Sequence, residues 1–205
     1  IRLSAAACIL VLLVAAPESS ADRSSGATAR AWAIKVIVPG QPETSTRVLG
    51  APDDAVAFDG PFAFPADGSI VSATSVTTSV SASSGVEATS AASSQVTMLS
   101  IFKGEITADA VTGETHALAS TASASGDIGL TGLTTLVVLG QPVTTLTPNQ
   151  QIPLADWGYA IALEQKSQRV DTPTPGYHGF VTALDIFLTA DHDGLPAGSE
   201  LQIGY

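Results

Sequence analysis

Apolar and polar residues alternate with a period of two in several short segments of the chain. The first of these segments, residues 31–38 (AWAIKVIV), ends at Pro39-Gly40. Alternate residues give it one apolar face: Trp32, Ile34, Val36 and Val38. This alternation predicts a β-strand with one buried face.

Pro, Gly and Asp are frequent in residues 39–69, which therefore predict a long irregular connection with a short strand or two. Residues 69–100 contain almost only Ser, Thr, Ala and Val, and they have no proline. Alternation on both sides of Ser83-Ser84-Gly85 predicts a hairpin there. A mucin-like linker is the alternative, but such stalks are usually rich in proline.

The second half continues in the same way. Residues 105–112 and 114–125 predict another pair of strands, separated by Gly113. A further strand with large inward residues is predicted from the alternation of Trp157, Tyr159, Ile161 and Leu163.

Residues 166–178 are polar and contain proline, which predicts an excursion between strands. Residues 180–189 (FVTALDIFLT) are apolar on both parities, as in a central strand buried on both faces. A loop at 190–199 and a closing strand with Leu201, Ile203 and Tyr205 follow. Together the segments predict an all-β domain over residues 30–205, an antiparallel β-sandwich of jelly-roll or immunoglobulin-like type.

An uninterrupted apolar run, Ala5–Ala16, follows Arg2 and ends at Pro17. This layout predicts a secretory signal peptide over residues 1–29, with cleavage after Ala29 or after Ala21. The run is shorter than the roughly 20 apolar residues of a membrane-spanning helix. We therefore expect a secreted or cell-surface protein with no stable membrane span in its mature chain. The alternative is a retained, pilin-like N-terminal helix.

Composition narrows the class of partner. The formal net charge is −11, and only 13% of the residues are charged. Nucleic acids and anionic lipids need clustered cations, so neither is an expected partner. The only cysteine, Cys8, lies within the predicted leader, which excludes disulfides and thiolate chemistry from the mature domain.

Candidate chemistry is sparse. His116, His178 and His192 are the only histidines, and no Gly-x-Ser-x-Gly sequence is present. No two histidines have the spacing of zinc ligands. The sequence thus predicts a protein that is not an enzyme, in which the histidines lie at the surface or in turns and His192→Ala is nearly silent.

Two loops hold the remaining candidates. Asp191 and Asp193, next to Gly194, are candidate calcium ligands, although an Asp-Gly turn accounts for the same residues and is favoured. No other cofactor is predicted. Tyr177, in a Pro-Gly-Tyr-His loop, is the candidate exposed aromatic for contact with a glycan.

Residues 106–205 resemble a family of bacterial surface proteins known as choice-of-anchor P. The resemblance rests on the strand ITADAV (106–111), the apolar block at 130–154, and the strand FVTALDIFLT followed by ELQIGY. It implies an exported, β-rich protein carried to the cell envelope by a C-terminal anchor. No sorting motif or apolar tail follows ELQIGY in this sequence, so we expect either that the anchor is absent or that the natural chain continues beyond Tyr205.

These observations predict a non-catalytic extracellular structural protein that self-associates into a filament, sheath or layer. The residues expected to form the assembly strand, donated to a neighbouring copy, are Trp32, Ile34, Val36 and Val38. A cell-surface adhesin or carbohydrate-binding module, with envelope glycans as partners, is the alternative.

Overall fold

The computed structural model describes residues 26–205, with Thr172 excluded. The apolar run of the predicted leader lies outside these residues. Within them, β-strands account for almost all regular structure, and one short 3₁₀ turn, η1 (Phe102–Gly104), is the only helical element. No helix in this part of the chain is long and apolar enough to cross a membrane.

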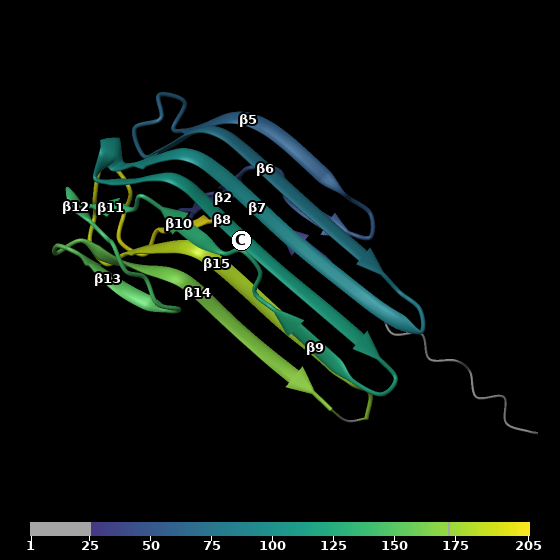
Figure 1. Cartoon of the computed structure of the whole chain (residues 1–205). Coiled ribbons are helices and arrows are strands. Elements are labelled where there is room, and N and C mark those ends of the chain that lie inside the picture. Colours follow the sequence, from purple (N-terminus) through teal and green to yellow (C-terminus); the bar gives the residue numbers. More distant parts are fainter. Residues whose placement is uncertain (1–25, 172) are drawn as a thin grey trace, which may run out of the picture.

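Two antiparallel sheets are built from strands that are mostly neighbours in sequence (Figure 1). The eight-stranded sheet has the order β12-β11-β8-β7-β6-β5, with β9 and β10 also paired to β8. Its strands are β5 (Val56–Phe64), β6 (Val71–Ser83), β7 (Glu87–Ile101), β8 (Ile106–Ser120), β9 (Ala124–Asp127), β10 (Gly132–Thr134), β11 (Val137–Val138) and β12 (Gln141–Pro142).

The six-stranded sheet has the order β13-β14-β15-β16-β2-β3. Its strands are β2 (Ile34–Ile37), β3 (Thr44–Ser45), β13 (Gln150–Leu154), β14 (Gly158–Val170), β15 (Gly176–Leu188) and β16 (Glu200–Ile203). A small third sheet joins β1 (Ala29–Ala31) to β4 (Leu49–Ala51).

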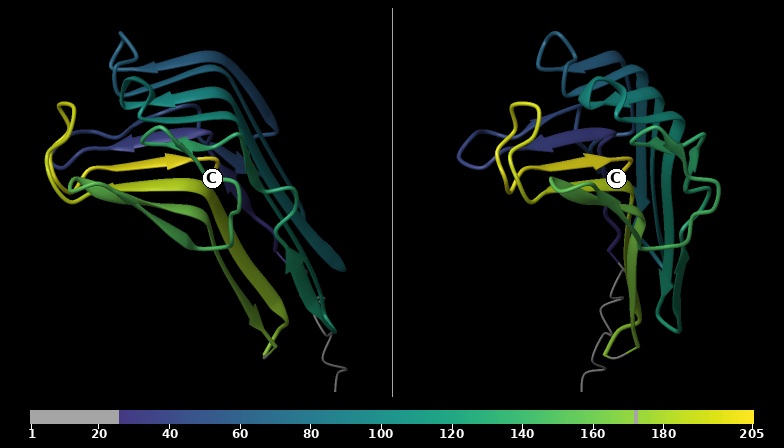
Figure 2. Two further views of the ribbon diagram at one scale, coloured as in Figure 1. Left: turned by 60° about the vertical axis from the view of Figure 1, so that its left-hand side comes forward. Right: turned by 90° about the vertical axis from the view of Figure 1, so that its left-hand side faces the viewer.

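One apolar core fills the space between the two large sheets, which form two layers in Figure 2. Residues of both sheets contribute to it, among them Val71, Val96, Ile106, Val111, Ile34, Leu184, Ile186 and Ile203. The prediction of an all-β protein with antiparallel sheets is confirmed; its jelly-roll or immunoglobulin-like type stays a prediction.

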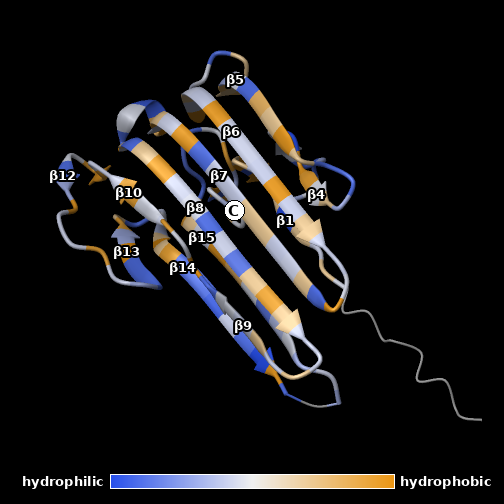
Figure 3. Cartoon of the chain, turned by 45° about the vertical axis from the view of Figure 1, so that its right-hand side comes forward, coloured by the Kyte–Doolittle hydropathy of each residue, from blue (hydrophilic) through white to orange (hydrophobic). Residues whose placement is uncertain are grey.

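Long strands carry both sheets past this core as two arms (Figure 2). Strands β7 and β8 have 15 residues each, and β14 and β15 have 13 each. Polar and apolar residues alternate along β6, β7 and β8 (Figure 3). A second, smaller core lies beside the arm, where β1 and β4 pack against Ala57 and Val80.

The hairpin predicted around residues 83–85 is confirmed, because β6 and β7 pair antiparallel along their length. The connection at 39–69 is more ordered than predicted and contains β3, β4 and the nine-residue edge strand β5. Gly113 does not end a strand, since β8 continues through it to Ser120. Glycine is required at this position because the backbone of Gly204 approaches it from the other sheet, and not because the chain turns there.

The inward face of β14 is the reverse of the predicted one, although Trp157, which directly precedes the strand, lies in the main core as predicted. Ala160 and Ala162 face the core and are fully buried, whereas Tyr159, Ile161 and Leu163 are half-buried on the opposite face. Alternation defines two faces of a strand without telling which one meets the other sheet. Small alanines there leave room for Leu184 and Ile186 of the neighbouring β15, whose predicted central position is confirmed.

The excursion predicted at 166–178 is shorter than expected. Residues 166–170 belong to β14 and residues 176–178 to β15, which pair as far as Val170 and Gly176, so only the connection between these two residues lies outside the strands. The strand predicted at 31–38 is interrupted at Trp32-Ala33, and β2 then lies between β16 and β3 inside the chain's own sheet.

Candidate functional site

The Asp191–Gly194 segment forms a tight hairpin between β15 and β16. His192 and Leu195 exchange two backbone hydrogen bonds of 2.9 and 2.8 Å. Asp193 and Gly194 between them both have positive φ, 44° and 90°, as a type I′ turn requires. The favoured interpretation of this sequence as an Asp-Gly turn is therefore confirmed.

The two predicted calcium ligands of this segment have separate surroundings. The carboxylate of Asp191 accepts the backbone N–H of Ala197 at 2.9 Å, which uses it within the loop. Asp193 forms an ion pair with Lys103 of η1 at 3.3 Å. The structure thus does not bring Asp191 and Asp193 together around one point.

Asp193 instead belongs to a group that the sequence analysis missed. Glu105, which follows η1, lies beside His192, and its Oε2 is 3.0 Å from His192 Nε2. One ligand atom from each of Glu105, His192 and Asp193 lies within 4.8 Å of the other two. Glu105 precedes His192 by 87 positions, so no local motif could have revealed the group.

Aromatic packing fixes the ring of His192. The ring stacks on Trp157 with a centroid distance of 4.0 Å and an interplanar angle of 6°. Phe102 meets both rings edge-on. Because His192 packs against two buried side chains, we expect His192→Ala to destabilise the fold, in contrast to the nearly silent effect predicted from the sequence.

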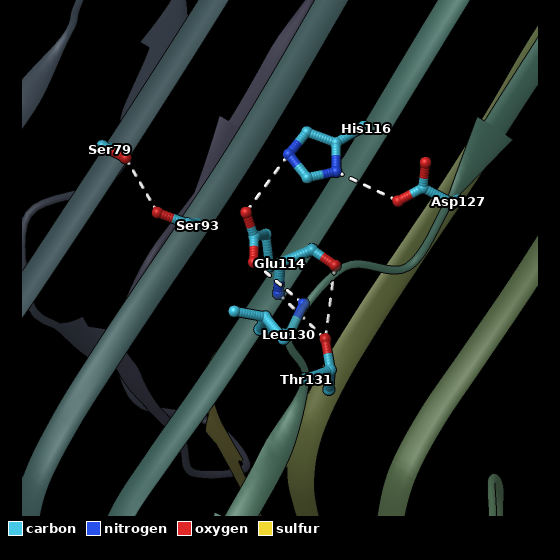
Figure 4. A network of polar contacts seen from close by, with 7 residues as sticks. All are labelled: Ser79, Ser93, Glu114, His116, Asp127, Leu130 and Thr131. Carbon is cyan, nitrogen blue, oxygen red and sulfur yellow. Dashed lines mark hydrogen bonds and ion pairs between the residues drawn. The ribbon is translucent and has the colours of Figure 1, made fainter.

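His116 has a different arrangement on β8 (Figure 4). Its Nε2 lies 3.2 Å from Glu114 and its Nδ1 lies 3.1 Å from Asp127. The carboxylates therefore occupy opposite sides of the ring and do not converge on one point. Nearby, the hydroxyls of Ser79 and Ser93 bond each other at 2.8 Å, across the neighbouring strands.

A cleft of about 200 Å³ lies between β1, β7, β8 and the first half of β15. Its lining combines charged and aromatic residues, including Arg30, Tyr177, His178 and Tyr205. Tyr177 is half-buried, and its ring lies where a Cβ on Gly126 of β9 would be. It therefore anchors β15 to β9 and is not the exposed aromatic that the sequence predicted.

The four predicted assembly residues do not share one environment. Ile34, Val36 and Val38 lie in the main core. Trp32 stacks on Tyr205 with a centroid distance of 3.7 Å, and the ammonium of Lys35 lies 3.8 Å from its ring. The break between β1 and β2 turns Trp32 away from the face that the other three share.

A buried carboxyl group lies on the outer side of β15. Asp185 is only 2% exposed, and its Oδ1 has no hydrogen-bond partner. Burial raises the pKa of Asp185 from 3.8 to about 9, and the nearby carboxylates of Glu200 and Glu164 add to the effect. The group is thus protonated at neutral pH.

Strand β5 ends the eight-stranded sheet, and its outer edge has no strand partner in the part of the chain that the structure describes. Val56 and Phe58 are 51% and 78% exposed, whereas Ala57 between them is buried. Two large apolar side chains on an unpaired edge are unusual for a soluble sheet. The Pro- and Gly-rich composition of residues 39–69 predicted only a short strand or two there, and it indicated neither the nine-residue length of β5 nor its position at the sheet edge.

No protein-family model matches the chain, and no curated protein or solved structure matches it either. The resemblance to the choice-of-anchor P family stays a prediction.

Proposed function

We propose that the protein is a non-catalytic structural protein of the cell exterior whose copies associate through the edge strand β5. The observation that carries the proposal is the exposure of Val56 and Phe58 on an unpaired edge. Sheet edges of soluble proteins are usually protected by lysine, proline or a covering segment. The first part of β5, residues 56–59, contains no lysine or proline, whereas Pro61 and the irregular pairing around Gly60 lie in its second part.

The backbone of β5 is suited to pairing with a second β5. Val80 donates its backbone N–H to the Ala55 carbonyl at 2.8 Å, which fixes the direction of the ladder. Backbone groups alternate in direction along a strand, so the N–H and C=O of Val56 and Phe58 point away from β6. An antiparallel pair centred on Ala57 would place Val56 of each copy opposite Phe58 of the other.

Such a contact would bury two apolar cross-strand pairs and satisfy four backbone groups on each copy. Aromatic and β-branched side chains form favourable cross-strand pairs in sheets. The two-fold arrangement uses the same surface on both subunits, as in most homodimers. Extension into a filament or layer would need a further contact beyond β5.

The alternative is that each copy donates its strand at residues 31–38 to a neighbour. This exchange requires a larger structural change than pairing through β5. Ile34 and Val36 are at most 1% exposed in the core, and β2 is paired with β16. Exchange would have to separate these contacts first. Pairing through β5 requires no opening of the fold, and for this reason we place the proposal there.

Introducing a positive charge at the edge tests the proposal. We expect the wild-type protein to associate in a concentration-dependent way in sedimentation velocity, and Val56→Lys or Phe58→Lys to remain monomeric. Val86→Lys is the matched control, because Val86 is 82% exposed but lies at the β6–β7 turn, away from β5. Association of all three variants at the wild-type level would contradict the role of β5.

Glycan binding in the cleft between the arms is the second candidate function. Arg30, His178 and the two tyrosine rings line one concave surface, and carbohydrate sites often combine polar groups with aromatic rings in this way. Glycan-array binding by the wild type that His178→Ala weakens would favour it. A silent array would contradict glycan binding in this cleft.

A further inference from the structure

The end of the molecule at the β15–β16 hairpin brings together residues of both large sheets. Glu105 lies between η1 and β8 of the eight-stranded sheet. His192 and Asp193 lie in the hairpin that joins two strands of the six-stranded sheet. Among residues 26–205, with Thr172 excluded, these three residues form the one group of three or more metal-ligating side chains whose ligand atoms converge on one point.

The donor set identifies the class of ion. One imidazole nitrogen and two carboxylate oxygens are ligands that Zn²⁺ accepts, whereas Ca²⁺ takes six to eight oxygens and no imidazole. Around tetrahedral Zn²⁺ with bonds of about 2 Å, neighbouring ligand atoms are roughly 3.3 Å apart. The observed separations, 3.0 Å for Glu105–His192 and at most 4.8 Å within the group, are close to this arrangement.

The imidazole is held in place before any ion binds. Stacking on Trp157 and the edge contact with Phe102 orient the ring so that Nε2 faces Glu105. A ligand already fixed in its binding orientation loses little conformational entropy when the metal arrives. Asp193 is exposed, so its side chain is free to close the last part of the distance.

A cation is already attracted to this point. The ammonium of Lys103 lies 3.3 Å from Asp193, but the Lys103 side chain is 66% exposed. An ion pair this open to solvent contributes little stability. Glu105 and Asp193 carry two negative charges, so replacing one ammonium by a divalent ion improves the charge balance.

We propose that Glu105, His192 and Asp193 bind a divalent transition-metal ion, with Zn²⁺ the best match, and that the ion links the two sheets at this end of the fold. Three protein ligands leave the fourth tetrahedral position for water. The site replaces the Asp191–Asp193 calcium site as the metal hypothesis for this loop, and it is independent of association through β5.

Zn²⁺ titration of the chelator-treated protein tests the site. We expect one Zn²⁺ per chain by isothermal titration calorimetry, a rise of the thermal midpoint on adding Zn²⁺, and no rise with Ca²⁺. His192→Phe keeps an aromatic ring on Trp157 and removes the nitrogen ligand, and Glu105→Gln removes a charge at a half-buried position. Each substitution should weaken Zn²⁺ binding at least tenfold, because replacing a residue that only supports a metal ligand already commonly reduces the affinity by that factor.

Three further variants separate this site from other binding. Asp191→Asn keeps an acceptor for Ala197 and should leave the affinity unchanged. His116→Phe removes a histidine that also has two carboxylate neighbours, but on opposite ring nitrogens, and should be equally silent. Lys103→Gln removes the competing ammonium and should tighten binding. Absence of Zn²⁺ binding, or wild-type affinity in folded His192→Phe, would overturn the proposal.

Discussion

Gly113 of β8 and Gly204 after β16 lie in direct backbone contact across the two sheets. A Cβ on Gly113 would overlap the carbonyl group of Gly204. Gly204 itself has φ of +76°, and a Cβ there would come within 2.9 Å of Ala183. Two glycines thus allow β8 and the chain end to approach more closely than any larger residues would.

We predict that Gly113→Ala destabilises the fold by about 1–3 kcal/mol, the usual cost of overpacking a tight interior. The backbone of Gly204 must shift to admit the methyl group. The measurement is the free energy of unfolding in urea, with Gly132→Ala as the control, because nothing lies within 4 Å of a Cβ at Gly132. Equal stability of the two variants would show that the close approach is not a constraint.

Leu184 and Ile161 test the reversed face of β14. Leu184→Ala should cost about 2–5 kcal/mol, since Leu184 is fully buried in the main core. Ile161→Ala should cost clearly less, because Ile161 is half-buried on the outer face. Thermal denaturation of both variants decides the point, and a larger loss for Ile161 would restore the inward orientation expected from the sequence.

Asp185 makes stability depend on pH. Its pKa is raised to about 9 in the folded protein by burial and by Glu200 and Glu164, against 3.8 ordinarily. The folded state therefore keeps a proton that the unfolded state releases above about pH 4. The contribution of this proton to the free energy of unfolding is fully present below that pH. It is lost at up to about 1.4 kcal/mol per pH unit as the pH rises toward 9.

Asp185→Asn has the same shape and no titratable proton. Between pH 5 and 8, which lies between the two pKa values of Asp185, we expect the free energy of unfolding in urea to decline less steeply in this variant than in the wild type. At pH 8 the variant should be the more stable of the two. An unchanged slope in the variant would mean that Asp185 is ionised in the folded protein.

The position of β1 bears on where a leader would be removed. Ala29 pairs with Ala51 and packs beside the small core, and Ala27 donates its backbone N–H to Ser84. Cleavage after Ala29 would remove these contacts, whereas cleavage after Ala21 would keep them. We predict a mature chain that starts at Asp22, and N-terminal sequencing that finds Arg30 would contradict this.

Local alternation was enough to predict the β class, the β6–β7 hairpin and the central strand β15. The same signal could not say which face of β14 is inward, because Ala160 and Tyr159 alternate equally well. Nor could it separate a turn glycine from Gly113, whose role depends on a segment 91 residues away. Both errors arise from packing between the sheets, which a period of two does not encode.

A candidate site could be predicted from the sequence only where its residues are also neighbours along the chain. The Asp193-Gly194 turn is local and was anticipated. The partner of His192 is Glu105, brought there by the stacking of two sheets, and Asp185 was hidden within an otherwise apolar strand. The exposed edge of β5 depends on the order of the strands in the sheet, which cannot be read from any single segment of the sequence.

Disulfide formation between two copies tests the central claim, association through β5, most directly. In a Cys8→Ser background, a chain carrying Val56→Cys is mixed with a chain carrying Phe58→Cys. Paired residues of an antiparallel sheet have Cα atoms about 5.5 Å apart, within the range that a disulfide spans. We predict a mixed 56–58 dimer in high yield on mild oxidation, and little dimer from either chain alone. A mixed dimer no more abundant than that formed with Val86→Cys would contradict the account.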